Sequence, residues 1–196
     1  MTTIYFKQHE KREKEKIFFK FLKSVLPNAE HINNNYLLDE ELLTKFIDIP
    51  KTIRLLKKDI KLSASKRNQT IAALTMLPDK VYVARSINEV SVDFAIVKDK
   101  KVQFIELHEK QHSQLSVSRL TPIVCSNNQR FEIPRFAQRL LKDIWRLENL
   151  PNYKIVWWDW FDKNKNTSSL NDILKADKIE FSITDKFSLS NLLKQA

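Results

Sequence analysis

Two carboxylates near the middle of the chain have the spacing of a metal site. Asp93 lies in the run VSVDFAIV (90–97) and Glu106 in the run VQFIELH (102–108). Both runs are rich in β-branched residues, which favours strands, and KDKK (98–101) between them favours a turn. Because side chains alternate across a strand, a hairpin places Asp93 and Glu106 side by side on one face. Two adjacent carboxylates repel unless a cation lies between them, and Mg²⁺ prefers such oxygen ligands.

Basic residues follow the second carboxylate at short intervals. His108 shares the face of Glu106, and Lys110 shares it too if the strand continues. An Asp, a hairpin-length gap and then Glu-x-basic resembles the PD-(D/E)XK nuclease superfamily, which includes most type II restriction endonucleases. The core of that superfamily is a helix, three antiparallel strands, a helix and a further strand, and the resemblance covers roughly residues 65–161. Two positions depart from the family pattern: Val92 stands where a Pro precedes the Asp, and His108 replaces the family Lys.

The resemblance implies a Mg²⁺-dependent endonuclease, in which Mn²⁺ can substitute, that hydrolyses phosphodiester bonds in double-stranded DNA. It makes Asp93 and Glu106 the metal ligands. It gives His108 or Lys110 the role of orienting the attacking water or stabilising the pentavalent state. Cutting both strands at a defined site usually takes two active sites, so the resemblance also implies a homodimer. We therefore expect a sequence-specific type II restriction enzyme.

The letters HEKQH (108–112) also spell the zinc-peptidase signature H-E-x-x-H. In that motif a helix presents two histidines to zinc, and the Glu beside the first activates water. The alternation in residues 102–108 favours a strand instead, and the two residues between the Glu and the second His are polar where such a helix packs in the core. Two alternatives stay open: a non-catalytic DNA-binding protein on the same scaffold, and a zinc hydrolase using His108, Glu109 and His112.

The elements around this hairpin follow from hydrophobic periodicity. Apolar residues at helical spacing predict helices over residues 14–26, 39–47, 50–60, 65–77 and 135–146. Runs rich in β-branched and aromatic residues predict strands over residues 81–87, 90–97, 102–108 and 153–161. The fold class is therefore α/β (α+β), and the resemblance implies a restriction-endonuclease-like core in which helices flank a mixed sheet of about four to five strands.

The chain length of 196 residues fits one domain, with an N-terminal helical region. We expect residues 1–78 to be mainly helical and to serve DNA backbone contact or dimerisation. Residues 79–161 then hold the catalytic core, and residues 162–196 form a helix–strand–helix tail.

Positive charge is abundant and clustered, because 34 Lys and Arg oppose 24 Asp and Glu, a net charge of +10. Such clustering suits a polyanion, and long polar side chains can read base edges. We therefore expect DNA contacts from one basic segment and one polar segment. Their candidate residues are Lys57, Lys58, Lys61, Lys66 and Arg67, and then Arg119, Asn127, Asn128, Gln129, Arg130 and Arg135. We expect Trp157, Trp158 and Trp160 to lie in the core rather than to stack on bases.

The composition excludes several other classes of protein. The chain has no glycine, so it contains neither a Gly-rich phosphate loop nor a dinucleotide-binding fingerprint. Its single cysteine, Cys125, excludes a disulfide framework within the chain. No apolar run approaches a membrane span, and the charged N-terminal residues do not resemble a signal peptide, so we expect a cytoplasmic protein.

The basic segment generates a first prediction. If Lys57 and Lys58 contact phosphates, replacing both by Ala should weaken binding to all DNA sequences alike. The slope of log affinity against log salt should become shallower by about 0.9 for each lost contact. Titration of labelled duplexes at several salt concentrations measures both effects. Binding by the unchanged protein that does not vary with salt would contradict the electrostatic interpretation.

Overall fold

The computed structural model describes two compact units. The structure describes residues 1–58, 64–83, 91–109, 120–124, 129–175, 182–184 and 187–188. The first unit comprises Met1–Leu37, Ser91–Lys110 and Leu150–Glu180, and the second comprises Leu38–Val90, Gln111–Asn149 and Phe181–Ala196. The two units interleave along the chain, and the three consecutive regions expected from the sequence stay a prediction. The single domain stays a prediction, because compact units need not fold independently.

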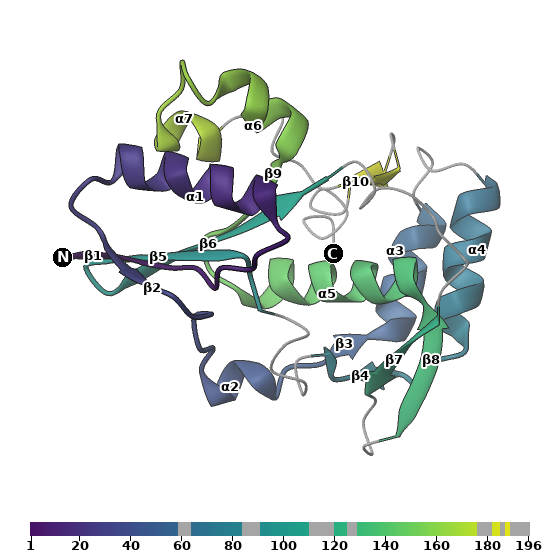
Figure 1. The fold of residues 1–196 in the computed structure, drawn as a ribbon. Helices are drawn as coiled ribbons and strands as arrows, with labels where there is room; N and C mark the ends of the chain where they lie inside the picture. Colours follow the sequence, from purple (N-terminus) through teal and green to yellow (C-terminus); the bar gives the residue numbers. More distant parts are fainter. Residues whose placement is uncertain are drawn as a thin grey trace. The chain divides into compact units, whose positions relative to one another are not determined.

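A five-stranded mixed sheet forms the centre of the first unit (Figure 1). The order across the sheet is β2 (Glu30–Ile32), β1 (Thr2–Tyr5), β5 (Phe94–Lys98), β6 (Lys101–His108) and β9 (Tyr153–Trp157). Strands β1, β5 and β6 are successively antiparallel, whereas β9 is parallel to β6 and β2 is parallel to β1. The structure confirms the expected class, which is a mixed α/β fold with a mixed sheet flanked by helices.

Three helices cover one face of this sheet: α1 (Glu13–Val25), α6 (Trp158–Asn164) and α7 (Leu170–Lys175) (Figure 1). The apolar stripe of α1 places Phe18 against Phe94 of β5 and Phe161 of α6, with ring centroids 5.0 and 4.7 Å apart. All three side chains are fully buried. Burying a Phe side chain contributes about 1.5–3 kcal/mol, so this cluster fixes the helices on the sheet.

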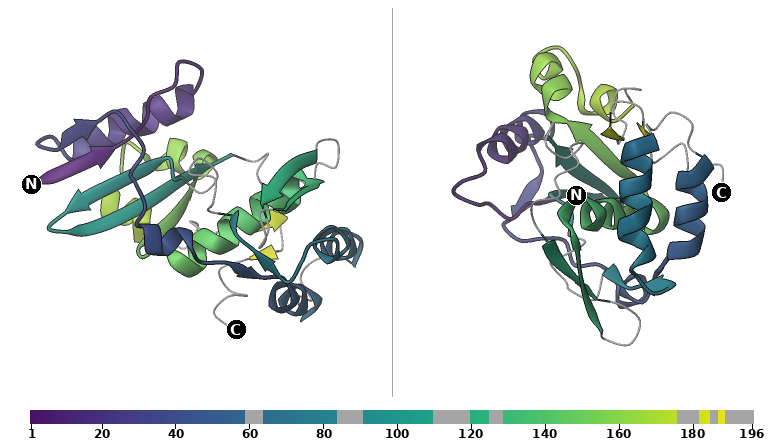
Figure 2. Two further views of the ribbon diagram at one scale, coloured as in Figure 1. Left: turned by 90° about the horizontal axis from the view of Figure 1, so that it is seen from below. Right: turned by 90° about the vertical axis from the view of Figure 1, so that its right-hand side faces the viewer.

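The second unit combines helices with short strand pairs. Helices α3 (Ile49–Lys58) and α4 (Ala64–Thr75) lie side by side, as the two blue helices in Figure 2 show. The other elements are α2 (Glu40–Leu43), the antiparallel pair β3 (Ile47–Asp48) and β4 (Lys80–Val81), the hairpin β7 (Leu120–Val124) and β8 (Arg130–Pro134), helix α5 (Arg135–Asn149), and the pair β10 (Ser182–Thr184) and β11 (Phe187–Ser188). Among the described residues, no helix has both the length and the apolar composition to cross a membrane.

Several elements differ from the prediction. The strand expected over 153–161 is wrong beyond Trp157, because the chain turns into α6 at Trp158. The helix expected over 39–47 ends at Leu43, and Ile47 belongs to β3. The strand expected over 81–87 is described only at its start, where β4 pairs with β3 and not with the hairpin of Asp93. Its expected place beside β5 is taken by β1, which the sequence did not indicate.

The turn between β5 and β6 is tight and lacks glycine. Asp99 and Lys100 both have positive φ, 50° and 63°, a combination typical of a two-residue type I′ hairpin turn. Glycine is the usual residue at such positions because its missing Cβ removes the steric conflict. The hairpin that carries the carboxylates therefore turns on two residues in a backbone region that side chains disfavour.

This turn generates a second prediction. Lys100→Gly should stabilise the protein by about 0.5–1 kcal/mol, since it relieves the left-handed conformation at some cost in unfolded-chain entropy. Lys101→Gly is the matched control: it falls in β6, where glycine weakens a strand, and should destabilise the protein. Urea unfolding measures both changes. A Lys100→Gly protein less stable than the original would contradict the prediction.

Candidate functional site

Asp93 and Glu106 lie opposite each other where the β5–β6 ladder ends. The last pair of the ladder is Phe94 with Ile105, so the next opposite pair is Asp93 with Glu106. The backbone N–H of Asp93 donates to Oε2 of Glu106 at 3.1 Å, and the backbone N–H of Leu107 donates to Oδ2 of Asp93 at 2.9 Å. The structure thus places the two carboxylates side by side, as strand parity indicates.

This pair offers two hard oxygen donors to a cation. Both side chains are partly buried at the end of the hairpin. A carboxylate has about four lone-pair positions, so the hydrogen bond to one oxygen is compatible with a metal ligand on the same group. Among the described residues, no group of three or more His, Cys, Asp and Glu is placed to hold a metal. Two carboxylates fit Mg²⁺, which commonly keeps several waters, better than a structural zinc site.

His108, the third predicted site residue, is the last residue of β6 and is buried. Its side chain is 1 % exposed, and its ring meets Trp157 edge to face with centroids 5.5 Å apart. His108 lies in a strand and Glu109 in no helix, so the zinc-peptidase helix does not begin where the motif requires it. Lys110 and His112 lie outside the described residues. His108 therefore contributes packing at the end of β6, and among the described site residues hydrogen bonds join Asp93 with Glu106 and Leu107.

The first turn of α1 adds charged groups that sequence reasoning missed. Lys14 Nζ lies 2.9 Å from Oε2 of Glu109, and Arg12 pairs with Glu15 at 3.0 Å. Burial raises the pKa of Glu15; Arg12 opposes the rise, whereas the neighbouring carboxylates Glu106 and Glu109 add to it. Glu15 therefore lies within electrostatic range of the carboxylate pair. No local signal could have identified it, because its position depends on how α1 packs on the sheet.

The predicted DNA-binding residues that the structure describes belong to the second unit. Lys57 and Lys58 are exposed in the last turn of α3, and Arg67 is partly exposed in α4. Gln129, Arg130 and Arg135 are exposed around β8 and the start of α5. Lys66 lies in α4, and the structure does not describe its side chain. Lys61, Arg119, Asn127 and Asn128 lie outside the described residues.

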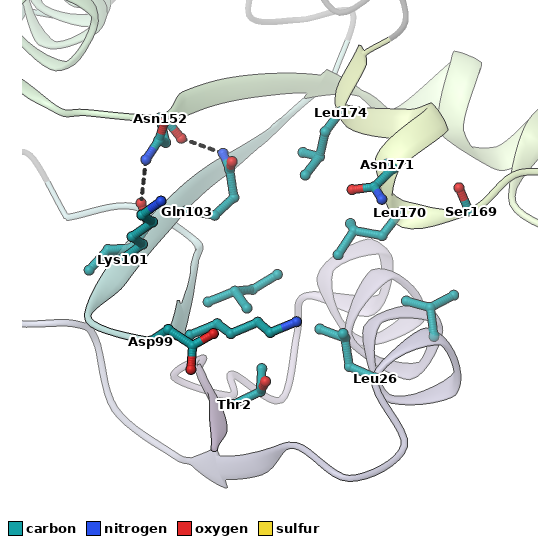
Figure 3. Close-up of a pocket in the computed structure, with 14 residues that line it drawn as sticks. Thr2, Leu26, Asp99, Lys101, Gln103, Asn152, Ser169, Leu170, Asn171 and Leu174 are labelled. Carbon is teal, nitrogen blue, oxygen red and sulfur yellow. Dashed lines mark hydrogen bonds between the residues drawn. The ribbon is translucent and has the colours of Figure 1, made fainter.

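A cavity of about 670 Å³ opens at the other end of the hairpin, around its turn (Figure 3). Leu26 and Leu170 contribute to its apolar wall, and Asn152 donates a hydrogen bond to the carbonyl of Val102 at 3.2 Å. Asp99 is the one acid among its lining residues. Neither Asp93 nor Glu106 lines this cavity, so the carboxylate pair lies outside it.

Comparison with known proteins gives no relative, because no family model, curated protein or solved structure matches the chain. The function must therefore be argued from the site alone.

The raised pKa of Glu15 generates a third prediction. A carboxyl with a raised folded-state pKa binds its proton more tightly in the folded protein, so it lowers stability as the pH rises above about 4.3 and through that pKa. Glu15→Gln should therefore raise the melting temperature by a few degrees at neutral pH. The gain should disappear in acid, where the original side chain is protonated in both states.

Glu13→Gln provides the matched control on the same helix. The hydrogen bond and charge of Lys16 lower the pKa of Glu13, so this carboxylate is favourable when ionised and its replacement should give no gain. Melting curves over a pH series compare the two variants. Equal behaviour of the two proteins would show that Glu15 is not strained by its neighbours.

Proposed function

We propose that this chain is a Mg²⁺-dependent endonuclease of the PD-(D/E)XK type that cleaves double-stranded DNA as a sequence-specific restriction enzyme. The observation that supports it most is a pair of hydrogen bonds: the N–H of Asp93 donates to Oε2 of Glu106, and the N–H of Leu107 donates to Oδ2 of Asp93. Together they hold the two carboxylates close to each other at the end of the hairpin. The order of elements supports it too. The antiparallel strands β5 and β6 are followed, after the inserted hairpin β7–β8, by helix α5 and strand β9, as a helix and a further strand follow the antiparallel strands in that superfamily.

The chain's own residues prepare the site for a phosphodiester. Asp93 and Glu106 would hold the Mg²⁺ ion, which when bound neutralises phosphate charge and lowers the pKa of a water. The N–H groups of Leu107 and Asp93 fix one oxygen of each carboxylate, so neither side chain needs to reorganise when substrate arrives. The burial of His108 favours a packing role, which leaves Lys110 as the predicted basic group for the attacking water.

Substrate binding is proposed for the basic residues of the second unit. The exposed Lys57 and Lys58 of α3 suit backbone phosphates, and the exposed Gln129 and Arg130 suit base edges. A homodimer would place one active site on each strand of the duplex.

A non-catalytic DNA-binding protein is the second candidate, and one observation favours it. Each carboxylate of the pair accepts a backbone N–H where the ladder stops, which is a sufficient structural reason for its presence. The two candidates differ in whether the negative charge itself is needed, because an amide oxygen also accepts a hydrogen bond.

This difference generates a fourth prediction. Asp93→Asn and Glu106→Gln keep an acceptor for the backbone N–H groups, so both should fold with nearly unchanged melting temperature and bind DNA at least as tightly. Each should lower cleavage about a hundredfold or more, because the Mg²⁺ ligands are lost. Cleavage of plasmid or genomic DNA with Mg²⁺ measures the rate, and duplex binding without metal is the second readout.

Glu109→Gln is the matched control, because Glu109 pairs with Lys14 of α1. It should retain much of the activity. His108→Ala should be impaired through lost packing against Trp157, and His108→Lys tests whether the family residue can act from this position. An active Asp93→Asn protein together with an inactive Glu109→Gln protein would overturn the proposal. So would a purified protein that holds one zinc ion through His108 and His112.

A further inference from the structure

The side chain of Trp158, at the start of α6, lies close to two lysine ammonium groups. Lys14 Nζ is 5.6 Å from the centroid of the indole ring, and Lys165 Nζ is 5.9 Å from it. Both distances are within the range of about 6 Å at which a cation interacts with an aromatic face. Lys14 comes from α1, beside α6 in Figure 1, and Lys165 directly follows α6. We call Lys14, Trp158 and Lys165 the Trp158 strip.

One end of the Trp158 strip lies beside Glu109, directly after β6. Lys14 Nζ lies 2.9 Å from Glu109 Oε2, and Glu109 follows β6 directly, three positions after Glu106. The next residue of α1, Glu15, responds electrostatically to both Glu106 and Glu109.

The two lysines of the strip are partly exposed and their present pairings are weak, whereas Trp158, which was expected in the core, is partly buried against it. The Lys14 side chain is 42 % exposed and that of Lys165 is 28 % exposed, and each pairs with a carboxylate, of Glu109 and Asp162 respectively. Exposed ion pairs contribute little, about 0–1 kcal/mol, so a polyanion can replace either carboxylate. The indole ring itself packs on Phe161 at 5.7 Å, which holds it rigidly against the core.

An aromatic face next to cations is the combination that binds single-stranded nucleic acid, because the ring stacks on a base while the cations contact the backbone. A duplex cannot use such a face, since its bases stack on one another. We propose that the Trp158 strip binds a single strand of DNA, with Lys14 and Lys165 on backbone phosphates and Trp158 stacked on an unpaired base. This single-strand binding deepens the proposed nuclease function, and its biological purpose rests on that function. It assigns the site a DNA substrate with an unpaired segment beside the cleaved bond.

The test measures binding of labelled oligo(dT) by fluorescence anisotropy in EDTA, so that no cleavage occurs. Trp158→Leu should weaken binding about tenfold, whereas Trp158→Phe should lose much less because it keeps a stacking face. Lys14→Gln and Lys165→Gln should each make the salt slope shallower by about 0.7. Lys16→Gln is the matched control on the same helix, because the Lys16 ammonium binds Glu13 and the carbonyl of Glu10 outside the strip.

The outcomes separate this inference from the nuclease proposal. Affinity and salt slope that match the unchanged protein in all strip variants would overturn the inference, even if the protein cleaves duplex DNA. Loss of affinity in the strip variants but not in Lys16→Gln supports the inference, even if no cleavage is found. If Trp158→Leu does not fold, the Lys14→Gln Lys165→Gln double variant compared with Lys16→Gln decides in the same way.

Discussion

The candidate site depends on two hydrogen bonds, one from the N–H of Asp93 to Glu106 and one from the N–H of Leu107 to Asp93. The backbone ladder of β5 and β6 stops at Phe94 and Ile105, and beyond it two side-chain carboxylates accept the next N–H groups. Buried backbone donors need partners, so the acids extend the sheet past its last regular pair. The same bonds fix the direction of both carboxylates. The same carboxylate oxygens therefore accept the structural hydrogen bonds and would bind the proposed metal ion. Replacing each acid by its amide keeps the hydrogen-bond acceptor but removes the charge, so it separates the structural role from the proposed catalytic role.

Several carboxylates lie at this end of the sheet and repel one another. Two unit charges about 4 Å apart near a protein surface interact by about 4 kcal/mol, a sizeable part of the stability of a typical domain. Glu109 and Glu15 bring two further negative charges to this end of the sheet. Lys14 of α1 pairs with Glu109, and Arg12, just before α1, pairs with Glu15. Burial and the neighbouring carboxylates favour the protonated form of Glu15, whose pKa is raised. In the proposed function, a Mg²⁺ ion at Asp93 and Glu106 would relieve the remaining repulsion between these carboxylates.

Some elements could be predicted because the signal was local. Apolar residues at helical spacing gave α1, and alternation gave β6, whose bounds of Lys101–His108 nearly match the expected 102–108. Other elements depend on partners that are remote in the chain. The short strand β1 has no distinctive pattern, yet it pairs with β5 more than ninety positions away. The segment 153–161 is apolar almost throughout, so periodicity could not show that β9 ends at Trp157 and α6 begins at Trp158.

By itself the sequence determined the hairpin and its parity, since alternation places Asp93 and Glu106 on one face wherever the hairpin lies. It also determined the net positive charge and, through the absence of glycine, a turn built on Asp99 and Lys100. Only the tertiary structure decided that His108 is buried against Trp157, and that α1 brings Glu15 and Lys14 to the end of β6. The physical reason is that burial and charge proximity arise from packing between distant segments, which no local pattern of residues encodes.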